Sequence, residues 1–307
     1  MPISAKNDEF IQLLESLLPE EGTVQTKIAS LSLSKVSTTA EFACSMMEPC
    51  VYFIARGAKE VYLAGQVYTY DASSYLISSV HLPLSGKITE ASLETPYLAL
   101  KLMFNLDEIM EVVREMGDAF SQPCSKKCDC ALVQGAMDEP LLNALIRLVS
   151  LLKNPKMIST LSPLIIKEIL YRLLDHHPQM FIKQFATMGS YAYRIMQAIR
   201  LINTHFAEPL RVTEMAHNLG MSNSLFHRHF KKVTTLTPIQ YQKKVRLQMA
   251  RKLLISHSMD AASASFQVGY ASPSQFSREY VRMYGLPPKS DAKRQDGFPK
   301  QVSTTVK

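Results

Sequence analysis

The spacing of apolar and polar positions changes twice along the 307 residues of this chain. Residues 8–18 place their apolar side chains on one face of a short helix. From about Thr23 to Leu102, short runs of β-branched and aromatic residues are separated by Gly, Asp or Ser, which is the pattern of strands joined by turns. Helical periodicity returns after Asn105. These patterns predict a helical arm over 1–20, an all-β sandwich or barrel over 21–104, and a helical region over 105–188.

Four leucines in the helical region follow a 4-3-4 spacing. This spacing occurs along the seam of a coiled coil, where it would join two copies of the chain. A helix that packs on the core of its own domain gives the same pattern. The spacing therefore leaves dimerisation and core packing both open for Leu141, Leu145, Leu148 and Leu152.

Two segments of the last third, 222–230 and 272–280, match each other fifty positions apart. Each opens with Ser, has aromatic residues four and eight positions later, and has Arg six positions later. Ser222 and Ser272 are predicted helix N-caps, because a hydroxyl can accept a hydrogen bond from a backbone N–H of the first turn. Aromatic residues four positions apart lie on one helical face, so we expect these pairs to be buried.

A short helical pattern and a glycine precede each serine, at 212–219 before Gly220 and at 261–268 before Gly269. Glycine adopts the left-handed conformation of a tight turn at low steric cost. A helix, a tight turn and a capped second helix make a helix-turn-helix. The sequence therefore predicts two such units, at about 212–233 and 261–284. A long helix over 238–256, with proline in its first turn, is predicted to join them.

Positive charge is concentrated in the same part of the chain. Residues 195–307 contain 17 Lys and Arg against 6 Asp and Glu, whereas residues 1–194 contain 17 against 21. A basic block alone is an ordinary solvated surface. Combined with an element that can enter a groove, it is typical of a protein that binds nucleic acid.

The outward side chains of the two second helices are the candidates for DNA contact. Arginine pairs well with guanine and glutamine with adenine in the major groove, whereas contacts to phosphate add affinity without sequence information. For Arg228 and Arg278 the alternative is an ion pair within the domain, since glutamates such as Glu279 lie nearby. The predicted base contacts are Ser224, His227, Arg228, Ser274, Gln275 and Arg278, and the predicted phosphate contacts are Lys231, Lys232, Lys243 and Arg282.

The run RVTEMAHNLGMSNSLFHRHFKKVTTLTPIQYQKKVRLQMARKLL, followed by VGYASPSQFSREYVRMYGLPP, resembles the DNA-binding domain of the AraC/XylS transcription regulators. The resemblance extends over 191–294 and departs at Asn223, where many relatives have Pro. It implies a helical domain that places two recognition helices in successive major grooves of double-stranded DNA. It also implies activation of transcription, with RNA polymerase as a partner.

The stretch from ARGAKEVYLAG to LETPYLALKL, residues 55–102, is similar to the sensory domains of one branch of this family. That similarity implies a cupin-like β-barrel that holds a small-molecule effector, with a homodimer formed through the helices behind it. The expected fold class is α+β: an N-terminal cupin-like barrel with dimerisation helices, then an all-α domain with two helix-turn-helix motifs joined by a long linker helix. The polar tail over 295–307 is predicted to be disordered.

Three cysteines, Cys124, Cys128 and Cys130, lie in a polar stretch with two adjacent lysines. Nearby positive charge makes a thiol more reactive, and such a cluster could bind a soft metal with one further ligand. A regulator switched by cysteine oxidation or by metal is therefore an alternative. A repair enzyme fused to this DNA-binding domain is another, although it needs a fourth ligand. A surface loop that tolerates sequence variation and has no function of its own also accounts for this stretch.

Other function classes have little support. A metal enzyme needs clustered His and carboxylate ligands, and the barrel region contains only His81. We therefore expect no enzyme activity and no cofactor. No run of about 18 apolar residues and no secretory signal pattern occurs, so the expected protein is cytoplasmic, without a membrane partner. A sensory domain that recognises a partner protein instead of a metabolite stays open.

Overall fold

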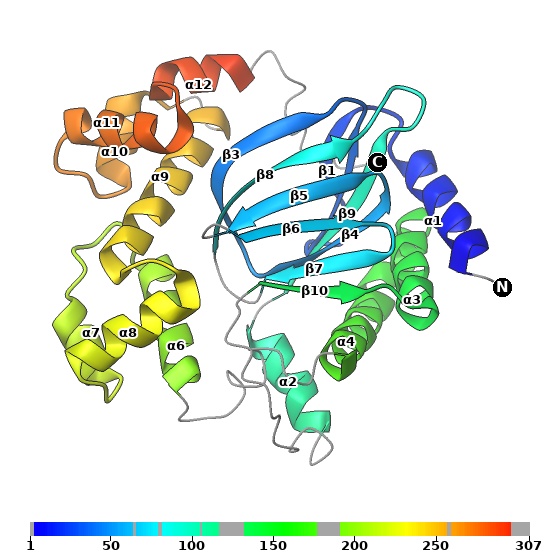
Figure 1. The fold of residues 1–307 in the computed structure, drawn as a ribbon, viewed down its shortest axis with the longest axis horizontal. Helices are drawn as coiled ribbons and strands as arrows, with labels where there is room; N and C mark the ends of the chain where they lie inside the picture. The colour runs from blue at the N-terminus through cyan, green and yellow to red at the C-terminus, as the bar shows by residue number, and fades with distance from the viewer. Residues whose placement is uncertain are drawn as a thin grey trace.

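The computed structural model describes residues 3–63, 66–78, 82–104, 106–116, 132–176, 191–256 and 259–295. A strand-rich N-terminal part is backed by helices, and an all-helical C-terminal part lies beside it (Figure 1). The strands are β1 (Gly22–Gln25), β2 (Leu31–Val36), β3 (Ala40–Met47), β4 (Cys50–Arg56), β5 (Ala58–Leu63), β6 (Gln66–Asp71), β7 (Ser74–Ser78), β8 (Leu82–Glu90), β9 (Tyr97–Met103) and β10 (Leu132–Ala136). The helices are α1 (Ile3–Leu17), α2 (Leu106–Met116), α3 (Glu139–Ser150), α4 (Ile158–His176), α6 (Tyr191–Thr204), α7 (Val212–Asn218), α8 (Asn223–Thr234), α9 (Pro238–Ser256), α10 (Ala261–Gln267), α11 (Pro273–Tyr284) and α12 (Pro288–Gln295).

The strands form two antiparallel sheets and no closed barrel among the described residues. One sheet has the order β1-β2-β9-β4-β7-β10 and the other the order β3-β8-β5-β6. The expectation of a closed cupin-like barrel was therefore wrong, because the strands form two separate sheets. Strand β7 pairs with β4 on one side and with β10 on the other, so it has no edge left for its sequence neighbour β6. Strand β10 comes from the region where only helices were expected.

Successive side chains of a strand point to opposite faces of the sheet. Consecutive residues of the central strands β4, β7 and β9 are buried, so these strands are covered on both faces. On β4, Val51 and Phe53 pack with α1, α3 and α4, whereas Ile54 faces the four-stranded sheet. The rings of Phe53 and Tyr75, on paired strands β4 and β7, lie 5.7 Å apart between their centroids. The N-terminal part therefore has one core under the helices and a second one between the sheets.

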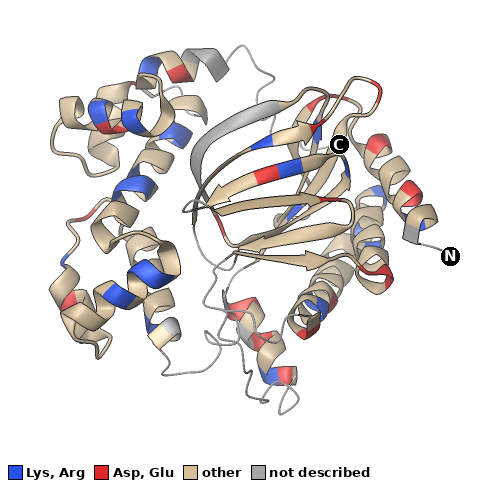
Figure 2. Cartoon of the chain, viewed as in Figure 1, with Lys and Arg blue, Asp and Glu red and all other residues tan. Residues whose placement is uncertain are grey.

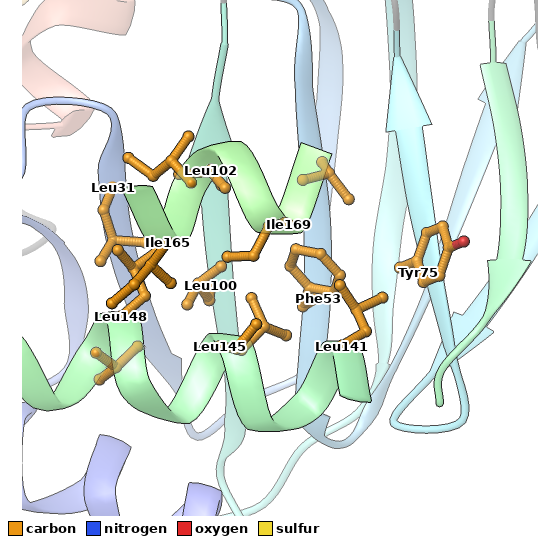
Figure 3. Close-up of a cluster of buried hydrophobic side chains, with 14 of the residues drawn as sticks. Leu31, Phe53, Tyr75, Leu100, Leu102, Leu141, Leu145, Leu148, Ile165 and Ile169 are labelled. Carbon is orange, nitrogen blue, oxygen red and sulfur yellow. The ribbon is translucent and has the colours of Figure 1, made fainter. Parts of the chain in front are cut away.

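The leucine seam of α3 belongs to the core under the helices. Leu141, Leu145 and Leu148 are fully buried against the six-stranded sheet, beside Ile165 and Ile169 of α4 (Figure 3). Of the two interpretations of the 4-3-4 spacing, core packing is therefore the one that the structure supports. The same side chains are not available for a coiled coil with a second chain.

Helix α9 connects the two helix-turn-helix units as one rod. Its first half places Tyr241 and Val245 in a core with α6 and α8, and its second half places Leu247 and Leu254 in a core with α10 and α11. Because both cores include the same helix, the orientation of one unit constrains that of the other. Within the described ranges, no helix has the length and apolarity needed to span a bilayer.

Candidate nucleic-acid interface

The interface is built on α8 and α11, which begin with the same hydrogen bond. The hydroxyl of Ser222 accepts from the Leu225 backbone N–H at 3.3 Å, and that of Ser272 accepts from Gln275 at 3.4 Å. Each serine thus satisfies an N–H that has no partner inside its helix. The first helical position is Asn223 in α8 and Pro273 in α11, and both helices form.

The aromatic pairs orient the two helices on the domain. Phe226 and Phe230 are fully buried with their ring centroids 5.6 Å apart, and Phe276 and Tyr280 are buried at 5.5 Å. These tilted and edge-on contacts are favourable for aromatic rings. Burial of this face leaves the opposite face of each helix to solvent.

The opposite faces carry the polar side chains that were expected to contact DNA. His227 and Lys243 are half-buried, and the other predicted contacts are exposed: Ser224, Arg228, Lys231 and Lys232 on α8, and Ser274, Gln275, Arg278 and Arg282 on α11. Figure 2 shows lysines and arginines along α8, α9 and α11, whereas charged residues are sparse on the strands. Two matched polar surfaces with positive charge are therefore presented by one domain.

Glu279 engages two of these side chains, Lys243 and Gln275, within the domain. It accepts from Lys243 Nζ at 2.8 Å, from the Tyr270 hydroxyl at 2.8 Å and from Gln275 Nε2 at 3.2 Å. Burial raises the pKa of Glu279 while these donors lower it, and the net effect is a lowering. Within the described residues, neither Arg228 nor Arg278 forms an ion pair. The alternative that Arg278 would be neutralised by Glu279 is therefore not what the structure shows.

Two side chains of α9 have a structural role that sequence reasoning missed. The Arg246 guanidinium donates to the carbonyls of Phe206 at 2.7 Å and Gly269 at 2.8 Å. Four residues earlier, Gln242 donates to the carbonyl of Glu208 at 2.7 Å. Residues four apart share a helical face, which was the available signal. Arg246 connects the loop after α6 to the second helix-turn-helix.

The turn of the second unit requires glycine. Gly269 has φ +89°, and a Cβ atom there would lie 2.0 Å from the carbonyl oxygen of Ala207. In the first unit, Gly220 has φ +63°, and its carbonyl accepts from Arg194 Nη1 at 2.7 Å. The turn of the second unit packs against the loop after α6, and the turn of the first unit is hydrogen-bonded to α6 itself.

A buried ion pair connects the last helix to the rest of the domain. Arg251 donates from Nε to Asp291 Oδ2 at 2.7 Å and from Nη2 to Oδ1 at 3.0 Å. The Tyr280 hydroxyl donates to the same Oδ2 at 2.8 Å. Helix α12 is thereby bonded to both α9 and α11.

The helical domain also contacts the sheets. Lys252 Nζ lies 3.1 Å from Glu48 Oε1, next to β3, and both α9 and α11 approach β3. Arg200 on α6 lies 3.9 Å from Asp107 on α2, beside a cavity of about 580 Å³ between the two parts of the chain. A change in the N-terminal part can therefore reach α6 through α2, and α9 through Glu48.

The predicted redox or metal site at Cys124, Cys128 and Cys130 lies outside the described residues, as does His81. Cys50, by contrast, is fully buried on β4. Burial raises the pKa of its thiol to about 12. A thiol with so little thiolate is a poor nucleophile and a poor metal ligand.

Several curated relatives align with this chain. HTH-type transcriptional regulator ArgR of Pseudomonas aeruginosa is 29% identical over 110 residues, which are 36% of this chain and 33% of ArgR. HTH-type transcriptional activator RhaS of Escherichia coli strain SE11 is 27% identical over 107 residues, 35% of this chain and 38% of RhaS. The chain thus spans little more than a third of either relative. Lactose operon transcription activator of Staphylococcus xylosus is 24% identical over 236 residues, 71% of this chain and 84% of that protein.

Solved structures of ToxT from Vibrio cholerae share the fold. The ToxT structure bound to unsaturated fatty acid superposes with a TM-score of 0.59 at 11% identity, covering 91% of this chain and 96% of ToxT. The structure bound to (E)-4-(8-methylnaphthalen-1-yl)but-3-enoic acid gives 0.61 at 12% identity, covering 89% and 98%. The order of strands, helices and paired helix-turn-helix units is therefore shared over nearly the whole length.

Two family models match this chain, and together they cover most of it. The model of the AraC-type transcriptional regulator N-terminus matches residues 27–179, and a helix-turn-helix domain model matches residues 215–294. The first covers strands β2 to β10 and helices α2, α3 and α4, and the second covers both capped helices. The chain belongs to the AraC/XylS family of transcription regulators.

Proposed function

We propose that this protein is a sequence-specific, DNA-binding transcription regulator that activates its target genes in response to a small molecule. The observation that carries this proposal is the matched pair α8 and α11. Both helices are capped by serine, both are buried through an aromatic pair, and both expose arginine. Exposed arginine on a helix that can enter the major groove is the usual device for recognising guanine.

The two helices would enter successive major grooves on one side of the duplex, about 34 Å or 10 bp apart. Lysines and arginines beside the base-contacting side chains would neutralise phosphates, which adds affinity and makes binding depend on salt concentration. Lys243 would have to share its charge between Glu279 and a phosphate. We propose base contacts from Ser224, His227, Arg228, Ser274, Gln275 and Arg278, and phosphate contacts from Lys231, Lys232, Lys243 and Arg282.

Genome-wide mapping of bound sites, followed by hydroxyl-radical footprinting on one of them, tests the proposal. We expect each protomer to protect two segments whose centres are about 10 bp apart on one face of the duplex. A footprint with a single protected segment per protomer would contradict the use of both units. Equal binding to unrelated sequences at physiological salt would contradict specific recognition.

The N-terminal part is proposed to bind the effector between its two sheets. ToxT, which shares this fold at 11% identity, has been solved with unsaturated fatty acid. That supports a ligand-binding role for a regulator of this fold without specifying a ligand here. Contacts from α2 to α6, and from Glu48 between β3 and β4 to α9, provide a route from the N-terminal part to the DNA-binding domain.

We further propose a homodimer, formed through α4 and not through the leucines of α3. Met157, in the turn just before α4, and Leu164 and Tyr171 on α4 lie seven residues apart, and 45%, 61% and 48% of their respective surfaces are exposed. Exposed apolar side chains at a seven-residue spacing form a stripe that fits the same stripe on a second copy. RNA polymerase is the proposed partner for activation, and the regulator is proposed to have no catalytic activity of its own.

A further inference from the structure

The space between the two sheets contains more polar groups than a core normally does. On β4 and β9, the residues that face this space include Tyr52 and Ile54, and Tyr97 and Ala99. Side chains alternate along a strand, so Lys101 lies on the same face of β9 as Tyr97 and Ala99. On the four-stranded sheet, Val61 and Leu63 of β5 face the same space. The same alternation places Lys59 with them.

Register brings these polar groups into one cluster. Lys59 on β5 is the direct cross-strand neighbour of Tyr70 on β6. Lys101 on β9 is the direct neighbour of Tyr52 on β4 in the opposite sheet, and directly opposed side chains begin about 5 Å apart. Lys59 Nζ lies 4.8 Å from the centre of the Tyr52 ring. Tyr52 is therefore in contact with Lys59 of one sheet and is the cross-strand neighbour of Lys101 in the other.

The environment of Lys59 opposes its positive charge. Burial, with the neighbouring charge of Lys101 adding to it, lowers the pKa of Lys59 to about 8, although the buried Cys50 acts in the opposite direction. Strongly perturbed groups of this kind are concentrated at binding and catalytic sites. Two lysines on facing sheets create a positive potential between them, which favours an anion at that place.

The hydroxyl of Tyr70 also lacks a partner. Only 1% of the surface of Tyr70 is exposed, and its hydroxyl has no hydrogen bond to any of the described residues. A buried hydroxyl without a partner is costly, and buried polar groups are normally satisfied. This donor lies across from Lys59, so an acceptor beside the ammonium group could satisfy both.

The rest of the lining is apolar. Ile54, Leu76 and Leu84 pack in the same cluster as the rings of Tyr70 and Tyr97. Such walls favour a ligand whose body is aromatic or aliphatic. They disfavour inorganic phosphate or a sugar, because most of the polar groups of those ligands would be left unpaired.

We propose that the space between the sheets binds a small monoanion with an apolar body, whose acidic group is held by Lys59, Lys101 and the hydroxyl of Tyr70. This inference rests on the proposed function, in which the N-terminal part binds an effector. It adds the chemical class of that effector and the three residues that select it.

Isothermal titration of the full chain at pH 7 in low-chloride buffer tests this site with matched pairs of probes. Benzoate is compared with benzamide, and hexanoate with hexanamide, so that charge changes while shape is kept. We expect at least one carboxylate to bind about 10- to 100-fold more tightly than its amide. If every amide binds as well as its carboxylate, or if no carboxylate binds, the assignment is wrong.

Three variants locate the site. Lys59→Met and Lys101→Met keep the length of the side chain and should each lose about tenfold or more in affinity for the carboxylate. Tyr70→Phe should lose several-fold, and it serves where a lysine variant fails to fold. The matched control is Lys87→Met on β8, whose ammonium pairs with Glu60 at 3.4 Å on the outer face of the same sheet. Unchanged affinity in all three folded variants would overturn the proposal.

The DNA-binding function is assayed separately on the same preparations, by footprinting on a mapped operator. Variants that bind the operator but no carboxylate leave the regulator intact and locate the anion site. If the wild-type protein binds the operator but shows no preference for carboxylates, the anion site is wrong and the proposed DNA-binding function stands. If the protein binds carboxylates but binds no DNA sequence specifically, the proposed function is wrong and the anion site stands.

Discussion

Lys243 Nζ lies 2.8 Å from Glu279 Oε1, so the carboxylate on α11 is engaged by the linker helix and not by its sequence neighbour Arg278. The side chain of Lys243 is 45% exposed and that of Glu279 is 19% exposed. Two consequences follow for the DNA-binding surface. Arg278 keeps its charge available for a base, and Lys243 can offer only part of its charge to a phosphate.

Lys231 and Lys243 should therefore differ in the salt dependence of operator binding. Lys231→Met is expected to reduce the slope of log affinity against log salt concentration by about 1, as the loss of one phosphate contact does. Lys243→Met should reduce it by clearly less, because Glu279 already uses much of its charge. Filter binding at several salt concentrations provides the slopes. A larger effect for Lys243 than for Lys231 would contradict the role given to Glu279.

Arg228→Ala should relax selectivity at one position of the operator. A bidentate contact between arginine and guanine contributes about 1–3 kcal/mol of discrimination against other bases, so that preference should disappear while the rest of the site stays selective. Binding to a library of operators randomised at each position measures this directly. Arg211→Ala is a suitable control, because Arg211 lies before α7 and pairs with Glu214 at 3.2 Å. Equal weakening for all sequences would show that Arg228 contacts phosphate instead.

Gly269→Ala and Gly285→Ala should have different effects on the free energy of unfolding. Both glycines have positive φ, but a Cβ at Gly285 meets no atom within 4 Å, whereas one at Gly269 meets the backbone of Ala207. Gly285→Ala should cost about 1–2 kcal/mol from backbone strain alone. Gly269→Ala must in addition displace the loop after α6 and should cost more than about 3 kcal/mol. Urea denaturation of the two variants would be compared, and similar losses would contradict the close approach of Gly269 to Ala207.

Lys59→Met should stabilise the protein at pH 7 in the absence of ligand. The folded state lowers the pKa of Lys59 from 10.5 to about 8, so the charged lysine destabilises the folded state by up to about 3 kcal/mol below pH 8. Between pH 8 and 10.5 the unfolded chain binds the extra proton, so the stability of the wild type rises with pH and the advantage of methionine shrinks. Urea unfolding at pH 7, 9 and 10.5 follows this trend. Loss of stability in the variant at pH 7 would show that the charge of Lys59 is satisfied by the fold.

Leu164→Glu should shift the protein from dimer to monomer. A carboxylate in the apolar stripe of α4 would be buried without a partner in the proposed interface. Sedimentation equilibrium at micromolar protein should then report the mass of one chain instead of two. Leu93→Glu is the control, because Leu93 is 83% exposed and lies between β8 and β9, away from α4. A dimer that survives Leu164→Glu would remove α4 from the interface.

The sequence by itself determined the features that depend on residues near each other in the chain. The N-cap serines, the buried pairs Phe226/Phe230 and Phe276/Tyr280, and the long helix α9 were all visible in the spacing. Hydrogen bonds of the first turn and the helical period act over three or four residues, so a local pattern is enough to specify them.

Tertiary structure decided what depends on segments far apart. The leucines of α3 could have formed a coiled coil, and only the sheet beneath them assigns them to the core. β10 takes the edge of β7 that a closed barrel would need. Arg246 donates to the carbonyls of the loop at 206–208, about 40 positions earlier in the chain, and only the fold places that loop against it. Lys59 and Lys101 are 42 positions apart in the sequence. They meet only because two sheets stack face to face, and strand register, which no single segment encodes, sets that convergence.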